Sequence, residues 1–155
     1  MDLAALENGA RVLDCSDRFY SSPDNMLFPG LARTQAEGWE TARRRDTGND
    51  WAEIALFAPG TIELAELDTS NLKFNAPAEA QLTATTTEGD QTVILPRTRL
   101  QPDTRHRYRL KTPEVEKVRL DIHPDGGLAR LRLWGLLTPK SEQAITARWN
   151  AHIYE

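Results

Sequence analysis

The sequence predicts an all-β fold, a sandwich or a barrel, built as one domain. Most of the chain divides into short runs in which apolar and polar residues alternate, and turn-forming residues separate these runs. Helical spacing over more than one turn occurs only near the C-terminus. Many short strands with little helix are typical of sandwiches and barrels rather than of α/β folds.

Five strands are predicted before residue 112. The first two, residues 51–57 and 61–68, are separated by Pro59-Gly60. The alternation of the second slips at Ala65-Glu66-Leu67, which indicates a bulge or a strand end. The other three span residues 80–87, 92–95 and 105–111, and the last alternates basic residues with His106, Tyr108 and Leu110.

The clearest local prediction is a β-hairpin over residues 117–135 with its turn at Pro124-Asp125-Gly126-Gly127. Proline fixes φ and the glycines accept positive φ, as a tight turn requires. With His123 opposite Leu128, the apolar pairs on one face are Ile122 with Ala129, Leu120 with Leu131, and Val118 with Leu133. On the other face Asp121 lies opposite Arg130, and Arg119 lies opposite Arg132.

A helix is predicted over residues 141–150. Pro139 precedes it, Ser141 can cap it, and its apolar residues have helical spacing. Trp149 is expected to pack back on the body. The chain is therefore divided into one β domain over residues 1–138 and a helical tail over residues 139–155 that packs on the same domain.

Composition excludes several classes of partner. The 155 residues are 39% hydrophobic and 27% charged, as in a folded domain. A net charge of -4 and a pI of about 5.4 argue against nucleic acid and anionic membranes as partners. No run approaches the ~18 apolar residues of a membrane span, and the N-terminus lacks the apolar core of a signal peptide.

The cysteine and histidine content bounds the chemistry further. Cys15 is the only cysteine, which favours a reducing compartment such as the cytoplasm, and a small packed residue is favoured over a nucleophile. His106 and His123 have no metal-site spacing, and HxH, HExxH and CxxC are absent. A soft-metal site is therefore not expected, while a carboxylate site for a harder divalent ion stays open.

Residues 38–51, GWETARRRDTGNDW, carry the densest chemistry. A solvated turn is one interpretation, because charge runs usually face solvent. A binding rim is the other, since the forks of Arg43, Arg44 and Arg45 suit a carboxylate and the nearby tryptophans suit a planar ligand. Glu40 and Asp50 either act on a proton or a water molecule, or pair with the arginines.

This stretch resembles the signature of allantoicases, GWETRRRR followed by GHDW. The resemblance covers nearly the whole chain and is strongest to the second of the two repeats in a full-length allantoicase. Three residues depart from the family pattern: Asn49 and Asn71 stand at histidine positions, and Phe74 stands at a glycine position. The other matching segments, in order, are CSDRFYSSPDNML at 15–27, APGTIELAELDTSNLKFNAP at 58–77, LPRTRLQPDTRHRY at 95–108 and VRLDIHPDGGLARLRLWG at 118–135.

The resemblance implies a jelly-roll β-sandwich of the galactose-binding-like type. It also implies hydrolysis of allantoate to ureidoglycolate and urea in purine degradation, with no cofactor, although a divalent metal stays open. The expected partners are a small-molecule substrate and either further copies of the chain or a second repeat. Two alternatives remain: a non-catalytic module that binds a small ligand, and a half-enzyme subunit that lacks the first repeat.

The resemblance also suggests roles for single residues. Glu40 and Asp50 are the catalytic candidates, which would orient or deprotonate the attacking water. Arg43 and Arg44 would hold the substrate carboxylate. The remaining substrate-binding candidates are Trp39 and Trp51 beside the arginines, Asp68 and Asn75 for the ureido groups, and Asp125 and Arg130 at the opposite rim.

Overall fold

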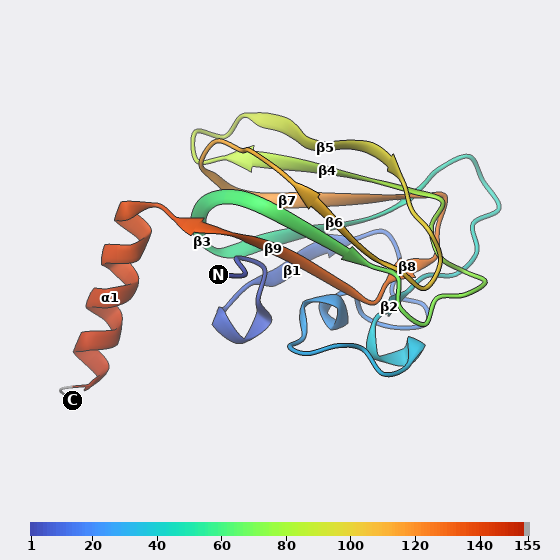
Figure 1. The fold of residues 1–155 in the computed structure, drawn as a ribbon, viewed down its shortest axis with the longest axis horizontal. Coiled ribbons are helices and arrows are strands. Elements are labelled where there is room, and N and C mark those ends of the chain that lie inside the picture. The colour runs from blue at the N-terminus through green and yellow to red at the C-terminus, as the bar shows by residue number, and fades with distance from the viewer. Residues whose placement is uncertain (154–155) are drawn as a thin grey trace.

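Residues 1–153, as described by a computed structural model, form a β-sandwich of two layers (Figure 1). The larger layer contains, in spatial order, β1 (Arg11–Cys15), the first half of β3 (Asp50–Asp68), β7 (Val115–His123), β4 (Glu79–Thr86) and β5 (Gln91–Arg99). In the smaller layer, β6 (Arg105–Arg109) and β9 (Arg130–Leu137) pair with the second half of β3. All these pairs are antiparallel, and the predicted all-β class is confirmed.

Strand β3 belongs to both layers. The sequence predicted two strands separated at Pro59-Gly60, but residues 50–68 form one strand that changes layer at this point. Gly60 pairs with Val115 of β7 and with Leu137 of β9, so it lies where the two layers meet. The predicted irregularity at residues 65–67 was misplaced, because the pairing with β9 shifts between Ile62 and Leu64.

The predicted hairpin over residues 117–135 is wrong. Strand β7 pairs with β3 and β4, whereas β9 pairs with the other half of β3, so residues 124–127 cross from one layer to the other. Asp121 lies opposite Trp51 and Gln81, and Arg130 lies opposite Asp68. The alternation of apolar and polar residues determines only which side chains face inward. A hairpin and a crossing between layers bury the same apolar residues, so the pattern does not distinguish them.

The interior between the two layers is filled by aliphatic side chains. Leu120 and Ile122 of β7 and Leu131 and Leu133 of β9 are completely buried, as the alternation predicted. Burial of one such side chain contributes roughly 1.5–3 kcal/mol. The core therefore holds together strands that are adjacent in the sequence but belong to opposite layers.

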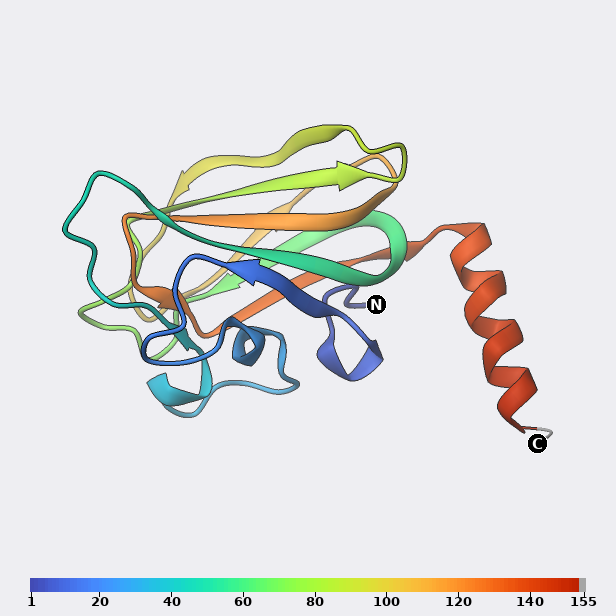
Figure 2. The same cartoon turned by 180° about the vertical axis from the view of Figure 1, so that it is seen from behind.

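A small sheet and three short helices lie at one side of the sandwich (Figure 2). The sheet pairs β2 (Trp39–Glu40) with β8 (Gly127–Leu128). Two of the 3-10 helices, η2 (Pro23–Leu27) and η3 (Gln35–Glu37), lie in the segment that leads from β1 to β2, and η1 (Leu6–Asn8) precedes β1. Backbone carbonyls of residues 25–37 accept hydrogen bonds from Arg130, which fixes this segment against β9.

Helix α1 (Pro139–Ile153) projects away from the sandwich at the end opposite β2 and β8 (Figure 1). It is longer than predicted, and Thr138 rather than Ser141 caps it, because Thr138 Oγ1 accepts a hydrogen bond from Ser141 N at 3.0 Å. Trp149 is 67% exposed, so the prediction that it packs on the body is wrong. No helix within residues 1–153 combines the length and the apolar character that crossing a membrane requires.

Candidate active site

The residues predicted for the site gather at the end of the sandwich opposite α1. We call this end the loop rim, and define it by residues 38–50, 71–78 and 123–127. Both ends of β3 reach it, because the strand leaves this end at Asp50 and returns to it at Asp68. Chain reversal at Pro59-Gly60 therefore brings together segments that lie far apart in the sequence.

The signature segment is clamped onto the turn at residues 124–127. Glu40 pairs with Gly127, and the amide of Thr41 donates to the carbonyl of Gly126 at 3.1 Å. In return, the amide of Gly126 donates to Thr41 Oγ1 at 2.8 Å. The two glycines of the turn have φ of +121°, a conformation that other residues rarely adopt.

Glu40 lies between two primary amides on the rim. Its Oε1 accepts hydrogen bonds from Asn75 Nδ2 at 3.1 Å and from Gln35 Nε2 at 2.5 Å. Its backbone amide donates to Ser21 Oγ at 2.7 Å, which fixes the start of the side chain. Glu40 is half-buried, so a carboxylate held in a defined position remains open to solvent on one side.

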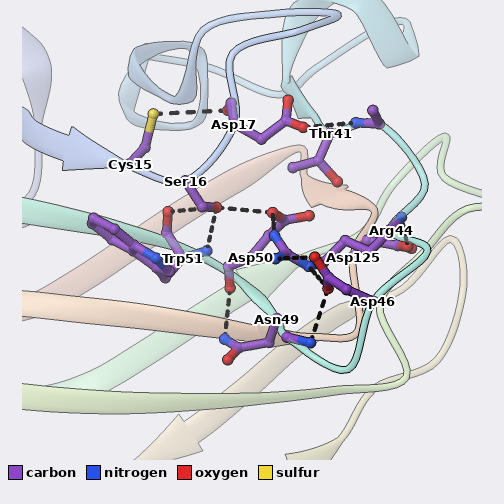
Figure 3. A network of polar contacts seen from close by, with 12 residues as sticks. Cys15, Ser16, Asp17, Thr41, Arg44, Asp46, Asn49, Asp50, Trp51 and Asp125 are labelled. Carbon is purple, nitrogen blue, oxygen red and sulfur yellow. Dashed lines mark hydrogen bonds and ion pairs between the residues drawn. The ribbon is translucent and has the colours of Figure 1, made fainter.

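Arg44 is held by three carboxylates (Figure 3). Its guanidinium donates to Asp46 at 2.9 Å and to Asp50 Oδ1 at 2.8 Å, and its backbone amide donates to Asp125 Oδ2 at 2.7 Å. Ser16 Oγ donates to the same oxygen of Asp50 at 2.9 Å. Arg44 is thus a fixed structural element of the rim, with few donors left for a ligand.

Charge pairing stabilises the ionised forms in this network. Hydrogen bonds to Asp46 and Asp50 raise the pKa of the Arg44 guanidinium. The hydrogen bond from Arg44 lowers the pKa of Asp46, and the amide of Gly48 adds to this effect. Asp50 is completely buried and its Oδ2 has no hydrogen-bond partner among the described residues, so it lies beneath the rim rather than on it.

Arg43 and Arg45 differ from Arg44. Both side chains are exposed, and neither forms an ion pair within residues 1–153. The sequence could not separate the three consecutive arginines. The structure leaves Arg43 and Arg45 as the guanidinium groups of this segment that are available to a ligand.

Trp39 is a core residue, which corrects its prediction as a substrate contact. It is completely buried, and it pairs with Leu128 across the small sheet. Its Nε1 donates to the carbonyl of Asp17 at 3.0 Å. The tryptophan therefore supports the rim from below, because a buried indole needs a partner for its N–H group.

Trp39→Phe is expected to lower the free energy of unfolding by about 2 kcal/mol, because it leaves a cavity and leaves the Asp17 carbonyl with only the weak Cys15 thiol donor, at 3.7 Å. Urea denaturation followed by circular dichroism measures this change. Trp149→Phe, at an exposed position on α1, is the matched control and is expected to change stability by less than about 0.5 kcal/mol. Equal midpoints for the two variants would contradict the buried role of Trp39.

Three other predicted contacts do not face the loop rim. Trp51 lies on the outer face of the larger layer, where the Arg119 guanidinium stacks 4.4 Å from its ring. Asp68 is completely buried, and its Oδ1 accepts a hydrogen bond from Ser70 N at 2.8 Å. Arg130 is buried against backbone carbonyls of residues 25–37. None of these side chains is placed to contact a ligand beside Glu40.

Of the three residues that depart from the family pattern, the two asparagines have local partners and Phe74 is exposed. Asn49 donates to Asp121 Oδ1 at 3.0 Å, and Asn71 donates from Nδ2 to the carbonyl of Ala32 at 3.1 Å. Asn71 has φ of +70°, which asparagine tolerates better than most residues. Phe74 is 96% exposed, so the ring adds bulk to the rim surface rather than to the core.

His123 lies at the edge of the rim, in a cavity of about 300 Å³ that also contains Arg97 and Glu79. Burial lowers the pKa of its imidazole below the ordinary value of 6.5, and the charge of Arg97 adds to this effect, against the opposite effects of Asp121 and Glu79. The fold therefore favours neutral His123.

The unfolded chain binds a proton at the His123 imidazole more tightly than the folded chain does. The contribution of His123 to stability is therefore present above pH 6.5 and is lost as the pH falls below that value. We expect the melting temperature of the wild type to fall more steeply between about pH 7 and 5 than that of His123→Gln. Calorimetric scans of both proteins across this range measure the difference. Parallel curves would contradict it.

Sequence reasoning missed several polar residues that support the site, among them Gln35 and Ser16. Gln35 contacts Glu40, and Ser16 contacts Asp50. Ser16 lies within the CSDRFYSSPDNML segment, and this resemblance was the signal that could have identified it. Gln35 lies outside every segment that carried the resemblance, so nothing in the sequence distinguished it. Within residues 1–153, no three His, Cys, Asp or Glu side chains are grouped to hold a metal ion.

A family model described as the allantoicase repeat matches residues 1–138. The chain belongs to the allantoicase family. It is 64% identical to a probable allantoicase from Nocardia farcinica over 139 residues, which is 88% of this chain and 42% of that protein. It is 49% identical to a probable allantoicase from Streptomyces avermitilis over 96% of this chain and 40% of that protein.

Solved structures agree with this assignment. The crystal structure of allantoicase from Saccharomyces cerevisiae matches with a TM-score of 0.83 and 35% identity, over 88% of this chain and 43% of that one. A family 32 carbohydrate-binding module from Streptococcus pneumoniae EndoD matches with a TM-score of 0.67 and 13% identity, over 88% of this chain and all of the module. The second match shows the fold alone. The chain thus spans about two fifths of the length of its allantoicase relatives.

Proposed function

We propose that the loop rim binds allantoate and takes part in its hydrolysis to ureidoglycolate and urea. The observation that carries the proposal is that Glu40 is held by two amides on the same short segment as Arg43, whose exposed guanidinium forms no ion pair within residues 1–153, in a chain of the allantoicase family. Allantoate is a small carboxylate with two planar ureido groups on one methine carbon. Such a ligand needs a guanidinium for its carboxylate and acceptors for its ureido N–H groups.

Each of these contacts to the substrate is assigned to a different residue. Arg43 holds the carboxylate, since its guanidinium is exposed and pairs with no carboxylate among the residues that the structure describes. Asn75 and Gln35 offer amide groups to a ureido group next to Glu40. Arg44 is a positioning residue, because Asp46 and Asp50 occupy its guanidinium while Asp125 holds its backbone.

Glu40 is the group that activates water. It takes a proton from a water molecule, whose oxygen forms a bond to the methine carbon while the bond from that carbon to one ureido nitrogen breaks. The nitrogen gains a proton as it leaves, so the products are urea and the hydroxylated carbon of ureidoglycolate. Glu40 is preferred to Asp50 for this role because Asp50 is completely buried.

The partner that we propose for this chain is another allantoicase repeat, corresponding to the first repeat of a full-length enzyme. The chain covers only 40% to 42% of the two bacterial relatives, and the matching family model is described as a repeat. A site shared between two repeats would explain a rim that is open on one side. The single free Cys15 is compatible with a reducing compartment, and we place the protein in the cytoplasm on that ground.

Urea release from allantoate by the purified chain tests the proposal, with and without added divalent metal and with and without a separately produced first repeat. Turnover that is lost when the rim residues are replaced supports the proposal, whether or not the added first repeat is needed for turnover. A folded chain that binds allantoate by calorimetry but releases no urea in any mixture is a binding module instead. A chain that neither binds nor hydrolyses allantoate in any mixture refutes the proposed site.

A further inference from the structure

A cavity that is separate from the loop rim lies on the outer face of the smaller layer, beneath residues 29–31. Its volume is about 310 Å³, at the lower end of the range for small-molecule sites. Strands β6, β3 and β9 supply charged side chains to it, and two large apolar side chains also line it. The residues that matter for its chemistry are Leu31, Glu66, Arg105, Arg130, Arg132 and Trp134.

Arg130 is a buried cation without a carboxylate partner. It is 4% exposed, and within residues 1–153 no carboxylate oxygen lies within 4 Å of its guanidinium. Its Nε and Nη1 donate to backbone carbonyls, including that of Gly30 at 2.9 Å, while Nη2 makes no hydrogen bond among the described residues. A buried charge of this kind is costly unless an ion of opposite sign accompanies it.

Arg132 brings a second positive charge to the same place. Its Nη2 donates at 2.8 Å to the carbonyl of Gly30, which Arg130 also contacts, so two guanidinium groups meet at one oxygen. Its nearest carboxylate, that of Asp2, lies 3.6 Å away. Burial and the charge of Arg132 lower the pKa of Arg130, against the opposite effects of the Glu37 and Asp68 charges.

Two of the three carboxylates that line the cavity are already engaged, and the third, that of Glu7, is exposed. Glu66 is 2% exposed, and its Oε1 forms an ion pair with Arg105 at 3.1 Å and accepts a hydrogen bond from Arg107 at 2.8 Å. Asp2 Oδ1 accepts hydrogen bonds from two backbone amides. The cavity therefore keeps Arg130, a guanidinium without an ion pair among the described residues, next to the apolar side chains of Leu31 and Trp134.

We propose that this cavity binds a small organic carboxylate. The carboxylate accepts hydrogen bonds from Arg130 Nη2 and from Arg105, and the organic part of the ligand packs against Leu31 and Trp134. A planar anion with two oxygens fits guanidinium donors better than a spherical ion does. The proposal does not rest on the function proposed for the loop rim, since no residue of that rim lines the cavity.

Calorimetric titration of the purified chain with malonate, benzoate and inorganic phosphate tests the proposal. We expect saturable one-to-one binding of at least one of the two carboxylates, and weaker binding of phosphate. Leu31→Trp fills the cavity without removing a charge, and Arg105→Gln removes one donor. Each is expected to weaken carboxylate binding by about tenfold or more, whereas Arg109→Gln, on the same strand but outside the cavity, leaves it unchanged.

Three results would overturn the assignment. They are no saturable binding of either carboxylate, equal affinity in Leu31→Trp and the wild type, and phosphate binding as tight as carboxylate binding. Thermal melts of both cavity variants show whether they are folded, and Arg107 still pairs with Glu66 when Arg105 is replaced. A loss of binding in Glu40→Gln instead would place the carboxylate at the loop rim and refute the cavity site.

Discussion

Gly127→Ala is expected to abolish the folded state or to lower the free energy of unfolding by about 4 kcal/mol or more. A methyl group at this position would lie 1.9 Å from the carbonyl oxygen of Trp39 and 2.9 Å from the Cα of Glu40. Both contacts are to backbone, so no side-chain rotation relieves them. The φ of +121° adds strain for any residue with a Cβ. Yield of soluble protein and urea denaturation measure the effect.

Gly89→Ala separates the cost of the steric contacts from the cost of the positive φ. Gly89 also has positive φ, at +93°, but an added methyl group there has nothing within 4 Å. Its expected cost is about 1–2 kcal/mol, which is the conformational term alone. If both variants lost equal stability, the close approach of the Trp39 backbone to the turn would not be what requires glycine at 127.

Much of the fold follows from the sequence because alternation reports which side chains are buried. It correctly predicted that Leu120 and Leu131 face the interior, and it correctly predicted β4, β5 and β6 to within a few residues. It did not identify which strands pair. The turn at residues 124–127 is equally compatible with a hairpin and with a crossing between layers, since strands on opposite sides of one core share the same inward face.

The candidate site shows a similar limit. The resemblance pointed to residues 38–51, and the structure brings Glu40, Arg44, Asn75 and Asp125 to one rim. It did not separate ligand-facing residues from supporting ones, because a motif records identity and spacing but not burial. Trp39 stands next to Glu40 in the sequence, yet in a strand neighbouring side chains point to opposite faces. Trp39 therefore lies in the core, and Glu40 lies on the side that reaches the surface.

Glu40→Gln is expected to lower turnover of allantoate by about 10²–10⁴-fold, which is the usual contribution of a positioned general base. The amide that replaces the carboxylate keeps the size of the side chain and one acceptor oxygen for Asn75 and Gln35. Stability should therefore change little, and substrate binding should weaken less than kcat. Steady-state kinetics of urea release, in whichever mixture the wild type is active, separates these quantities.

Two matched variants show whether the loss belongs to Glu40 itself. Glu37→Gln removes a nearby carboxylate that pairs with Arg33 away from the amides, so its kcat should stay within about threefold of the wild type. Asp50→Asn weakens the buried support of Arg44, and a positioning role predicts a loss of stability along with a smaller loss of kcat. If Asp50→Asn abolished turnover while Glu40→Gln did not, the base would lie beneath the rim. Arg44 would then have to move aside for water to reach it.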